Sequence, residues 1–222
     1  MESHIVKILD VTKVTHDVRG FKVEKPAGYM FTPGQATEVA INKDGWTEER
    51  RPFTFTNLPD DDHIEFTIKT YPERNGVTNQ LRGLKAGDEL ILHDVWGAIS
   101  YKGQGLFIAG GAGITPFLSI FRFLRSTGQT SGNRLLFANK KKEDIILEDQ
   151  LNTLLDGNVT NVLSEDNIDG YKHGYVTEGL LNEMSIQQHD KLYICGPPPM
   201  LDALLKMFSN MGLSEQSVVM EI

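Results

Sequence analysis

The sequence predicts two consecutive domains: an N-terminal antiparallel β-barrel over residues 1–102 and a C-terminal α/β domain with a parallel sheet over residues 103–222. Three observations support this fold class. The first half contains many short, β-rich segments separated by turn residues, with one helical stretch. The second half alternates apolar strand-like runs with helical ones, as parallel-sheet domains do. The pattern changes near residues 99–105, and 222 residues suffice for two small domains.

In the first half, turn residues mark where the expected strands end. Pro33 and Gly34 precede one strand, and residues 42–45 (Asn-Lys-Asp-Gly) form a hairpin-type turn after it. The one expected helix, Thr78 to Leu84, is followed by residues 85–88 (Lys-Ala-Gly-Asp), which end it. The expected strands are His4 to Val14, Gly20 to Val23, Gln35 to Ile41, Pro52 to Thr56, His63 to Lys69 and Glu89 to His93. Many short strands with a single helix favour a small antiparallel barrel.

In the second half, apolar strands and amphipathic helices follow one another. Strands are expected at Leu106 to Ala109, Arg134 to Ala138, Val159 to Leu163, Leu192 to Cys195 and Ser217 to Glu221. Helices are expected at Thr115 to Arg125, Ile145 to Leu155, Val176 to Leu181 and Pro198 to Met211. Strand–helix–strand units form right-handed crossovers, so these segments predict a parallel sheet with helices on both faces.

The composition excludes several classes of protein. A net charge of −8 argues against a nucleic-acid partner, because neutralising phosphates requires clustered lysine and arginine. Cys195 is the only cysteine, so a disulfide framework, a cysteine-based zinc site and an iron–sulfur cluster cannot be built, and we predict no metal. The same scarcity of cysteine favours a reducing cytoplasm.

Neither the N-terminus nor the longest uncharged stretch predicts a signal peptide or a membrane-spanning helix. The first ten residues contain Glu2, Lys7 and Asp10 and no apolar run long enough for a signal peptide. Residues 103–121 contain no charge, but they hold five glycines and Pro116, whereas a membrane span needs about 20 mostly apolar residues. A buried strand, a tight turn and a helix explain this stretch better.

A glycine-rich segment, Ala109 to Pro116, lies between the first strand and first helix expected in the second domain. Glycines there let the backbone approach a pyrophosphate, and the helix N-terminus offers N–H groups and a positive dipole end. The usual dinucleotide fingerprint ends in a third glycine, where this chain has Pro116. Taken alone, the segment is equally consistent with a strand–helix turn that binds nothing.

A second segment, Cys195 to Met200, also follows a buried strand and precedes a helix. Ligands of open α/β sheets bind along that carboxyl edge. Three consecutive prolines, at positions 197–199, make the loop rigid, so it can present a wall to a planar ring. A lone cysteine at a strand end is usually a small core residue, but its neighbours here favour a functional role.

Two segments of the first domain could serve a ligand. On one strand Arg51 can bind phosphate oxygens, Phe53 can pack on a ring, and Thr54 can hydrogen-bond a ring heteroatom. Spacing alone favours the alternative, an amphipathic strand with an exposed arginine. Residues 76–78 (Gly-Val-Thr), at the start of the expected helix, could offer N–H groups to a second phosphate.

Together, in their order and spacing, these segments resemble the ferredoxin–NADP reductase superfamily over nearly the whole chain. Residues 51–54 (Arg-Pro-Phe-Thr) look like its Arg-x-Tyr-Ser/Thr flavin motif. Residues 68–71 (Ile-Lys-Thr-Tyr) and 76–78 look like its second flavin and pyrophosphate segments, and 111–116 like its nucleotide phosphate loop. Residues 195–200 (Cys-Gly-Pro-Pro-Pro-Met) resemble its nicotinamide-proximal motif, the most specific of the set.

The resemblance implies roles for particular residues. Thr54 would hydrogen-bond the flavin nitrogen that accepts hydride, Arg51 would bind flavin phosphates, and Tyr71 would stack on the flavin or its adenine. Cys195 would lie beside the reacting carbon of the nicotinamide and shape its approach, without acting as a covalent nucleophile. Glu221 resembles the family's C-terminal acidic residue near the flavin, and it is equally consistent with a solvated charge at the tail. Thr54, Cys195 and Glu221 are therefore the expected catalytic residues.

The resemblance also implies a larger set of cofactor-binding residues. These are Arg51, Pro52, Phe53, Thr54, Ile68, Lys69, Tyr71, Gly76, Val77, Thr78, Gly111, Gly113, Thr115, Pro116, Asn139, Ser164, Glu165, Cys195, Gly196, Pro197 and Met200.

The chain departs from the family pattern at three places. Phe53 replaces the usual tyrosine, so a phenolic hydroxyl is lost while stacking remains. The chain ends at Ile222 without the terminal aromatic residue that some members stack on the flavin. Residues 163–166 (Leu-Ser-Glu-Asp) stand where NADP-using members often have Ser-Arg, and Glu165 would repel a 2′-phosphate, which favours NADH. Against this, the run Lys140 to Lys142 could supply positive charge, although such runs are more often solvated.

The function expected on this basis is hydride transfer from NAD(P)H to bound FAD, followed by single-electron transfer to a separate carrier such as a ferredoxin or flavodoxin, or to an oxygenase component. FAD is preferred to FMN because most members with the second phosphate segment use it. With two domains only, any iron–sulfur or haem group would belong to another protein. Catalysis would be mainly positioning, because the cofactors supply the chemistry.

Two other functions remain open. A flavin-free nicotinamide-linked dehydrogenase would need an acid or base facing the nicotinamide, and no histidine or lysine is placed there by a motif. A non-catalytic nucleotide-sensing module would be expected to have lost Arg51, Thr54 or Cys195, and all three are present. Bound flavin would distinguish these functions, since it gives absorption bands near about 375 and 450 nm.

Overall fold

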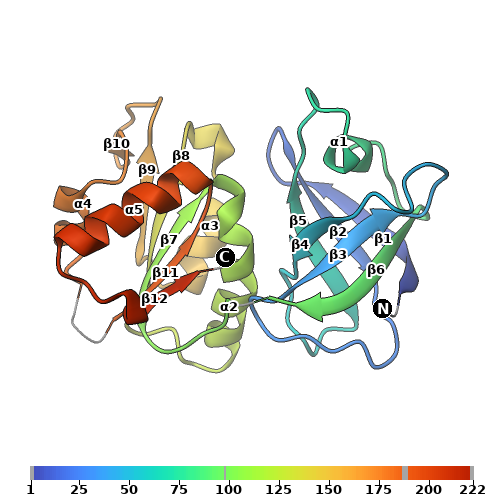
Figure 1. Cartoon of the computed structure of the whole chain (residues 1–222), viewed down its shortest axis with the longest axis horizontal. Coiled ribbons are helices and arrows are strands. Elements are labelled where there is room, and N and C mark those ends of the chain that lie inside the picture. Colours follow the sequence, from blue (N-terminus) through green and yellow to red (C-terminus); the bar gives the residue numbers. More distant parts are fainter. Residues whose placement is uncertain (1–2, 98, 187–189, 221–222) are drawn as a thin grey trace.

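The structure is a computed structural model that describes residues 3–97, 99–186 and 190–220. It has two lobes that lie side by side (Figure 1). One lobe is built on an antiparallel sheet of six strands, and the other on a parallel sheet of six strands with helices. The predicted fold class is therefore confirmed.

The N-terminal lobe is a barrel. Its strands are β1 (His4–Lys13), β2 (Val18–Glu24), β3 (Ala36–Ile41), β4 (Arg51–Thr54), β5 (His63–Lys69) and β6 (Glu89–Trp96), in the order β4-β3-β6-β1-β2-β5. An antiparallel bridge between Phe55 and Phe66 joins the two edges and closes the sheet. Inside, alternate residues such as Phe21, Phe55 and Phe66 are fully buried. Helix α1 (Val77–Leu81) adds Val77 and Leu81 to this core.

The C-terminal lobe contains a parallel sheet in the order β10-β9-β8-β7-β11-β12. Its strands are β7 (Gly105–Gly110), β8 (Arg134–Asn139), β9 (Val159–Leu163), β10 (Lys172–His173), β11 (Lys191–Cys195) and β12 (Val218–Met220). The helices are α2 (Thr115–Ser126), α3 (Glu148–Leu154), α4 (Glu178–Glu183) and α5 (Pro198–Asn210). Within the described residues, no helix combines the length and the apolar character that crossing a bilayer requires.

Successive residues of β7 serve opposite faces of this sheet. Phe107 and Ala109 pack in the cluster that contains α2 and α3, whereas Leu106 and Ile108 pack with α4 and α5. Helices therefore cover both faces, as the strand–helix alternation predicts. Because both faces are buried, the strand reads as a continuous apolar run in the sequence.

The expected elements differ from the observed ones mainly at their ends. The helix expected at Ile145 to Leu155 begins only at Glu148, because Leu147 has a left-handed backbone conformation with φ of 53°. α4 begins at Glu178, two residues later than the expected Val176. Thr177 caps it, because its hydroxyl accepts a hydrogen bond from the amide of Leu180. β10 was not predicted, because two residues carry no detectable periodicity.

The segment between the lobes is held by Tyr193, which lies on β11. The Tyr193 hydroxyl accepts a hydrogen bond from the Lys102 amide at 2.8 Å and donates one to the Gly103 carbonyl at 2.7 Å. Its ring is fully buried and stacks on Phe107, with ring centroids 4.0 Å apart. Burial raises the pKa of Tyr193 to about 12, so the hydroxyl keeps the proton that it donates.

We expect Tyr193→Phe to lower the free energy of unfolding by about 1–2 kcal/mol, because two backbone groups lose a buried partner. Urea unfolding followed by circular dichroism measures the change. Tyr175→Phe is the matched control, since Tyr175 is 80% exposed and should leave the stability unaltered. Equal stability of the two variants would show that the hydroxyl does not hold the segment.

Candidate functional site

Two loops meet at the carboxyl edge of the parallel sheet, after the neighbouring strands β7 and β11. A Cβ atom at Gly113 would lie 2.2 Å from the carbonyl oxygen of Cys195, and one at Gly110 would lie 2.5 Å from Sδ of Met200. Both positions therefore require glycine because the loops pack on each other. The sequence interpretation assigned the glycines to ligand approach, so for Gly113 the structure supplies a different reason.

Gly111, in the loop after β7, differs from Gly110 and Gly113 because it does not pack against the loop after β11. Its φ is 52°, and no atom lies within 4 Å of the position a Cβ would take. The loop continues as a 3₁₀ turn, Gly111–Ile114, into α2, where no side chain caps the helix N-terminus and Pro116 occupies the first turn. Uncapped N–H groups at the start of a helix suit an anionic group.

The flavin-like motif of the barrel touches this loop through two hydroxyls. Thr54 ends β4, and its Oγ1 lies 2.8 Å from Oγ1 of Thr115, the first residue of α2. Thr115 also donates a hydrogen bond to the Ala112 carbonyl at 3.0 Å. The structure thus brings together Thr54 and Thr115, two predicted site residues that are 61 positions apart.

One face of α2 makes this contact between the lobes. Thr115, Ser119 and Arg122 follow one another at helical spacing, and each bonds the barrel. Ser119 accepts a hydrogen bond from the Gly34 amide at 3.0 Å. Arg122 bonds the carbonyl of Thr56 and pairs with Glu65 at 2.6 Å. Sequence reasoning missed Ser119 and Arg122, although polar residues at this spacing on an apolar helix were a usable signal.

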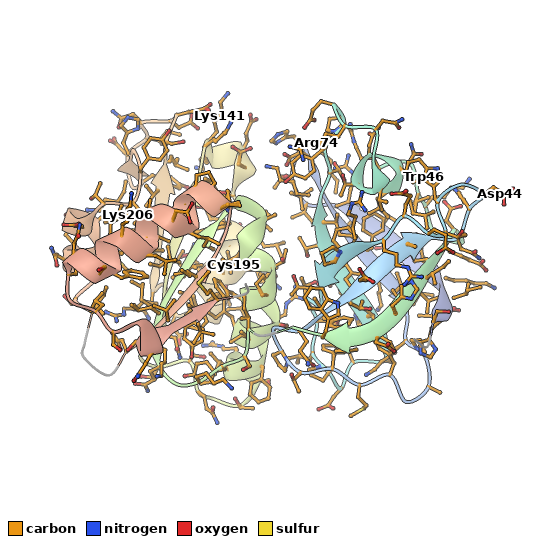
Figure 2. All side chains as sticks on the ribbon, viewed as in Figure 1. Asp44, Trp46, Arg74, Lys141, Cys195 and Lys206 are labelled. Carbon is orange, nitrogen blue, oxygen red and sulfur yellow. The ribbon has the colours of Figure 1, made fainter. Side chains whose placement is uncertain are left out.

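The other barrel residues of the predicted site have mixed surroundings. The Arg51 side chain is half exposed; its guanidinium donates a hydrogen bond to the Arg50 carbonyl at 2.5 Å and lies 3.7 Å from Glu49. Phe53 packs against Phe66 at the barrel wall. Tyr71 lies beneath the guanidinium of Arg74, 5.0 Å from the ring centroid. Figure 2 shows Arg74 on the barrel and Cys195 in the other lobe.

Several predicted site residues are engaged with other residues of the barrel. Pro52 lies in β4 and Ile68 is in the barrel core, so Ile68 could meet a ligand only through its backbone. The Lys69 ammonium pairs with Asp17 at 2.9 Å. Gly76 has an extended backbone and precedes α1, which begins with Val77 and Thr78. Glu221 lies outside the described residues.

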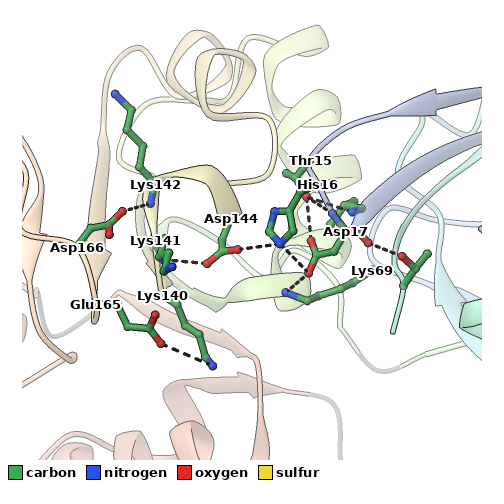
Figure 3. A network of polar contacts seen from close by, with 12 residues as sticks. Thr15, His16, Asp17, Lys69, Lys140, Lys141, Lys142, Asp144, Glu165 and Asp166 are labelled. Atoms are coloured by element: carbon green, nitrogen blue, oxygen red, sulfur yellow. Dashed lines mark hydrogen bonds and ion pairs between the residues drawn. The ribbon is translucent and has the colours of Figure 1, made fainter. Parts of the chain in front are cut away.

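The residues expected near the nucleotide ribose follow β8 and β9. The Ser164 amide donates to the Asn139 carbonyl at 3.0 Å, which brings the two strand ends together. The Asn139 side chain is buried, and its amide has no partner among the described residues. Glu165 pairs with Lys140 at 3.8 Å, and both side chains are exposed (Figure 3). Lys142 lies over the Tyr171 ring, so the lysines do not form one continuous cationic surface.

The loop after β11 carries the remaining predicted residues. Cys195 is half buried at the end of the strand, and the backbone of Gly196 lies against that of Gly110. Pro197 precedes α5, and Met200, in its first turn, reaches back toward Gly110. These residues therefore form one side of the loop pair.

A second polar network joins the lobes (Figure 3). His16 of the barrel lies between Asp17 and Asp144, with 3.7 Å from Nε2 to each carboxylate. Three donor atoms lie close enough to hold a metal ion. The Lys69 ammonium beside Asp17 opposes a cation there, so we assign the cluster to contact between the lobes.

Charge pairing changes the ionisation of Asp17 and Lys69. Partial burial disfavours the Asp17 carboxylate, but hydrogen bonds from Lys69 and Thr15 outweigh it, so the pKa of Asp17 lies below its usual value. Burial likewise disfavours the Lys69 ammonium, and Asp17 outweighs it, so the pKa of Lys69 is raised. The pair is therefore ionised over the whole neutral range.

Comparison with known proteins identifies both lobes. Residues 5–101 match a family described as Oxidoreductase FAD-binding domain, and residues 107–206 match one described as Oxidoreductase NAD-binding domain. The chain is 30% identical over 234 residues to the reductase component of propane 2-monooxygenase from Rhodococcus jostii, with 98% of this chain and 62% of that protein covered. It is 26% identical over 220 residues to the ferredoxin–NAD(P)⁺ reductase component of the naphthalene 1,2-dioxygenase system from Pseudomonas putida, with 95% and 66% covered.

A further relative and two solved structures extend the comparison. NADH-cytochrome b5 reductase 1 from Ajellomyces capsulatus is 29% identical, with 97% of this chain and 76% of that protein covered. The chain spans less than two thirds of the length of the two oxygenase reductase components, at 62% and 66%. A ferredoxin NADP⁺ reductase from Neisseria gonorrhoeae with bound FAD and NADP shares the fold, with a TM-score of 0.86, 20% identity and coverage of 100% and 98%. The human Ncb5or CS-b5R domains in their NAD⁺ form give a TM-score of 0.86 at 25% identity, covering 100% of this chain and 70% of that one.

We expect Gly113→Ala to destabilise the protein by about 2–4 kcal/mol, because the added methyl group overlaps a backbone carbonyl that cannot move alone. Thermal unfolding measures the loss. Gly179→Ala, in α4, is the control: no atom lies closer than 3.8 Å, and alanine favours helix, so stability should rise slightly. A fully stable Gly113→Ala variant would contradict the packing described for the two loops.

We expect Asp17→Asn to reduce stability by about 1 kcal/mol at neutral pH. The pKa of Asp17 is lowered by folding, so its contribution is present above the unfolded value and is lost as the pH falls through the folded one. The difference from the unaltered protein should thus be present at neutral pH and shrink below about pH 4. Urea unfolding across this range measures it, with the exposed Asp10 changed to Asn as control. A difference that grows in acid would contradict the assignment.

Proposed function

Since the chain belongs to the ferredoxin reductase family of FAD- and NAD-binding oxidoreductases, we propose that it transfers hydride from NADH to bound FAD and passes electrons singly to a separate protein. In this proposal residues 1–102 hold FAD and residues 103–222 hold the nicotinamide nucleotide. The observation that carries it is the contact between Thr54 and Thr115, because it sets the flavin motif directly against the nucleotide loop.

The residues of the site fit a flavin. Arg51 is half exposed, and its guanidinium has donors besides the one bonded to the Arg50 carbonyl, so it can still bind phosphate oxygens. Tyr71 and Arg74 offer a flat, cationic surface for a ring. The uncapped start of α2 and the left-handed Gly111 suit the pyrophosphate of the nucleotide. When bound, FAD supplies the change from two-electron to one-electron chemistry.

The protein's own part in the reaction is positioning. Thr54 would hydrogen-bond the flavin nitrogen that receives hydride, and Cys195 would border the nicotinamide. Pro197 and the two prolines that begin α5 restrict the backbone that follows Cys195. Glu221 is proposed as an acid near the flavin. None of these residues needs to form a covalent bond with substrate.

Glu165 supports NADH as the preferred nucleotide. In the proposed complex the carboxylate would lie near a 2′-phosphate, and Lys140 lies 3.8 Å from that carboxylate. Lys142 is engaged with Tyr171. An added phosphate would therefore meet the negative charge of Glu165.

The acceptor is proposed to be a small electron-carrier protein or an oxygenase component. The relatives named above include reductase components of a propane monooxygenase and a naphthalene dioxygenase, and a cytochrome b5 reductase. These names describe reductase components of oxygenase systems and a reductase of cytochrome b5.

The test is anaerobic reduction of the FAD-loaded chain by NADH and by NADPH in parallel. We expect absorption bands near about 375 and 450 nm that bleach at least tenfold faster with NADH. A chain that retains neither FAD nor FMN would favour a flavin-free dehydrogenase or a sensing module instead. A flavoprotein reduced faster by NADPH would overturn the assignment of Glu165.

Glu165→Gln separates charge from shape in this experiment. It removes the repulsion without changing the size of the side chain, so the rate with NADPH should rise about tenfold while the rate with NADH stays the same. Asp169→Gln alters another residue downstream of β9 and serves as the control for net charge.

A further inference from the structure

The hydroxyls of Thr54 and Thr115 form a short chain of hydrogen bonds with one possible direction. Thr115 Oγ1 lies 3.0 Å from the carbonyl oxygen of Ala112, and a carbonyl can only accept. The single hydroxyl proton of Thr115 is therefore used in that bond. Helical threonines commonly bond a carbonyl in the preceding turn in this way.

The direction of the next bond follows. Thr54 Oγ1 lies 2.8 Å from Thr115 Oγ1, and Thr115 has no second proton to donate. Thr54 must then be the donor, and this is its one side-chain hydrogen bond among the described residues. With its proton committed to Thr115, the Thr54 hydroxyl can offer only lone pairs to any other group.

We infer that Thr115 is a positioning residue that makes the Thr54 hydroxyl a hydrogen-bond acceptor, and so favours reduced over oxidised FAD. The inference rests on the proposed function, in which Thr54 faces the flavin nitrogen that receives hydride. In oxidised flavin that nitrogen carries a lone pair and can only accept a hydrogen bond. In reduced flavin it carries hydrogen and can donate one. A hydroxyl restricted to accepting matches the reduced form alone.

The position of Thr115 also links this preference to the contact between the lobes. Thr115 starts α2, whose Ser119 and Arg122 bond the barrel from the same helix face. The distance between the two hydroxyls is thus held by the docking of the lobes and not by either loop alone. Among the described residues, no residue of β4 accepts a hydrogen bond from the Thr54 hydroxyl.

The inference is tested by measuring the reduction potential of bound FAD in Thr115→Val. The variant keeps the shape of the side chain but frees the Thr54 proton to bond oxidised flavin. We expect the dissociation constant for oxidised FAD to fall three- to tenfold relative to that for reduced FAD. A tenfold change lowers a two-electron potential by about 30 mV. Thr115→Ser keeps the hydroxyl and should restore the original potential.

Two further variants keep the test decisive. Thr115→Ala removes the hydroxyl with less bulk and should lower the potential in the same direction if Thr115→Val does not fold. In Thr54→Val the potential should no longer respond to a second change at Thr115, because the hydroxyl that transmits the effect is gone.

The outcomes distinguish the two proposals. An unaltered chain that binds no FAD overturns the proposed function and this inference with it. FAD-loaded Thr115→Val or Thr115→Ala with an unchanged or raised potential overturns the inference and leaves the proposed function standing. A lowered potential that Thr115→Ser does not restore also counts against it, since a structural disturbance would then explain the shift.

Discussion

The docking of one helix face against the barrel is the constraint on which the site depends. α2 begins at the edge of the parallel sheet, and its polar residues Thr115, Ser119 and Arg122 all bond the first lobe. Val18 of the barrel and Ile99 of the connecting segment pack in the same apolar cluster as this helix. Apolar burial supplies the attraction between the lobes, and the hydrogen bonds select one orientation.

Glycine has two separate uses in the nucleotide loop. Gly110 and Gly113 let the loop approach the segment that follows β11, whereas Gly111 takes a left-handed conformation away from it. Of the three, only Gly111 is placed to contact a ligand. A glycine-rich motif can therefore be required by the protein's own packing at some positions and by a cofactor at others.

Much of the fold could be predicted because its signals are local. Period-two strands, the alternation of strands and helices, and motif loops at strand ends all appear in short stretches of sequence. What could not be predicted are contacts between residues distant in sequence. Docking of the lobes brings Thr54 to Thr115, and the pairing of β2 with β5 brings Lys69 to Asp17. The left-handed conformation of Leu147 makes α3 shorter than expected, and the apolar pattern of the sequence does not indicate this. Roles toward a cofactor remain predictions for the same reason, since they depend on a group outside the chain.

The shared apolar cluster has a consequence for how the protein unfolds. Val18 and Ile99 lie outside the parallel-sheet domain in sequence, yet they are buried within its core. Separating the lobes would expose them together with the inner face of α2, so the parallel-sheet lobe would lose part of its apolar interior, whereas the barrel has a core cluster of its own. Unfolding of the barrel would therefore remove buried contacts from the parallel-sheet lobe, so the stability of that lobe depends on the barrel.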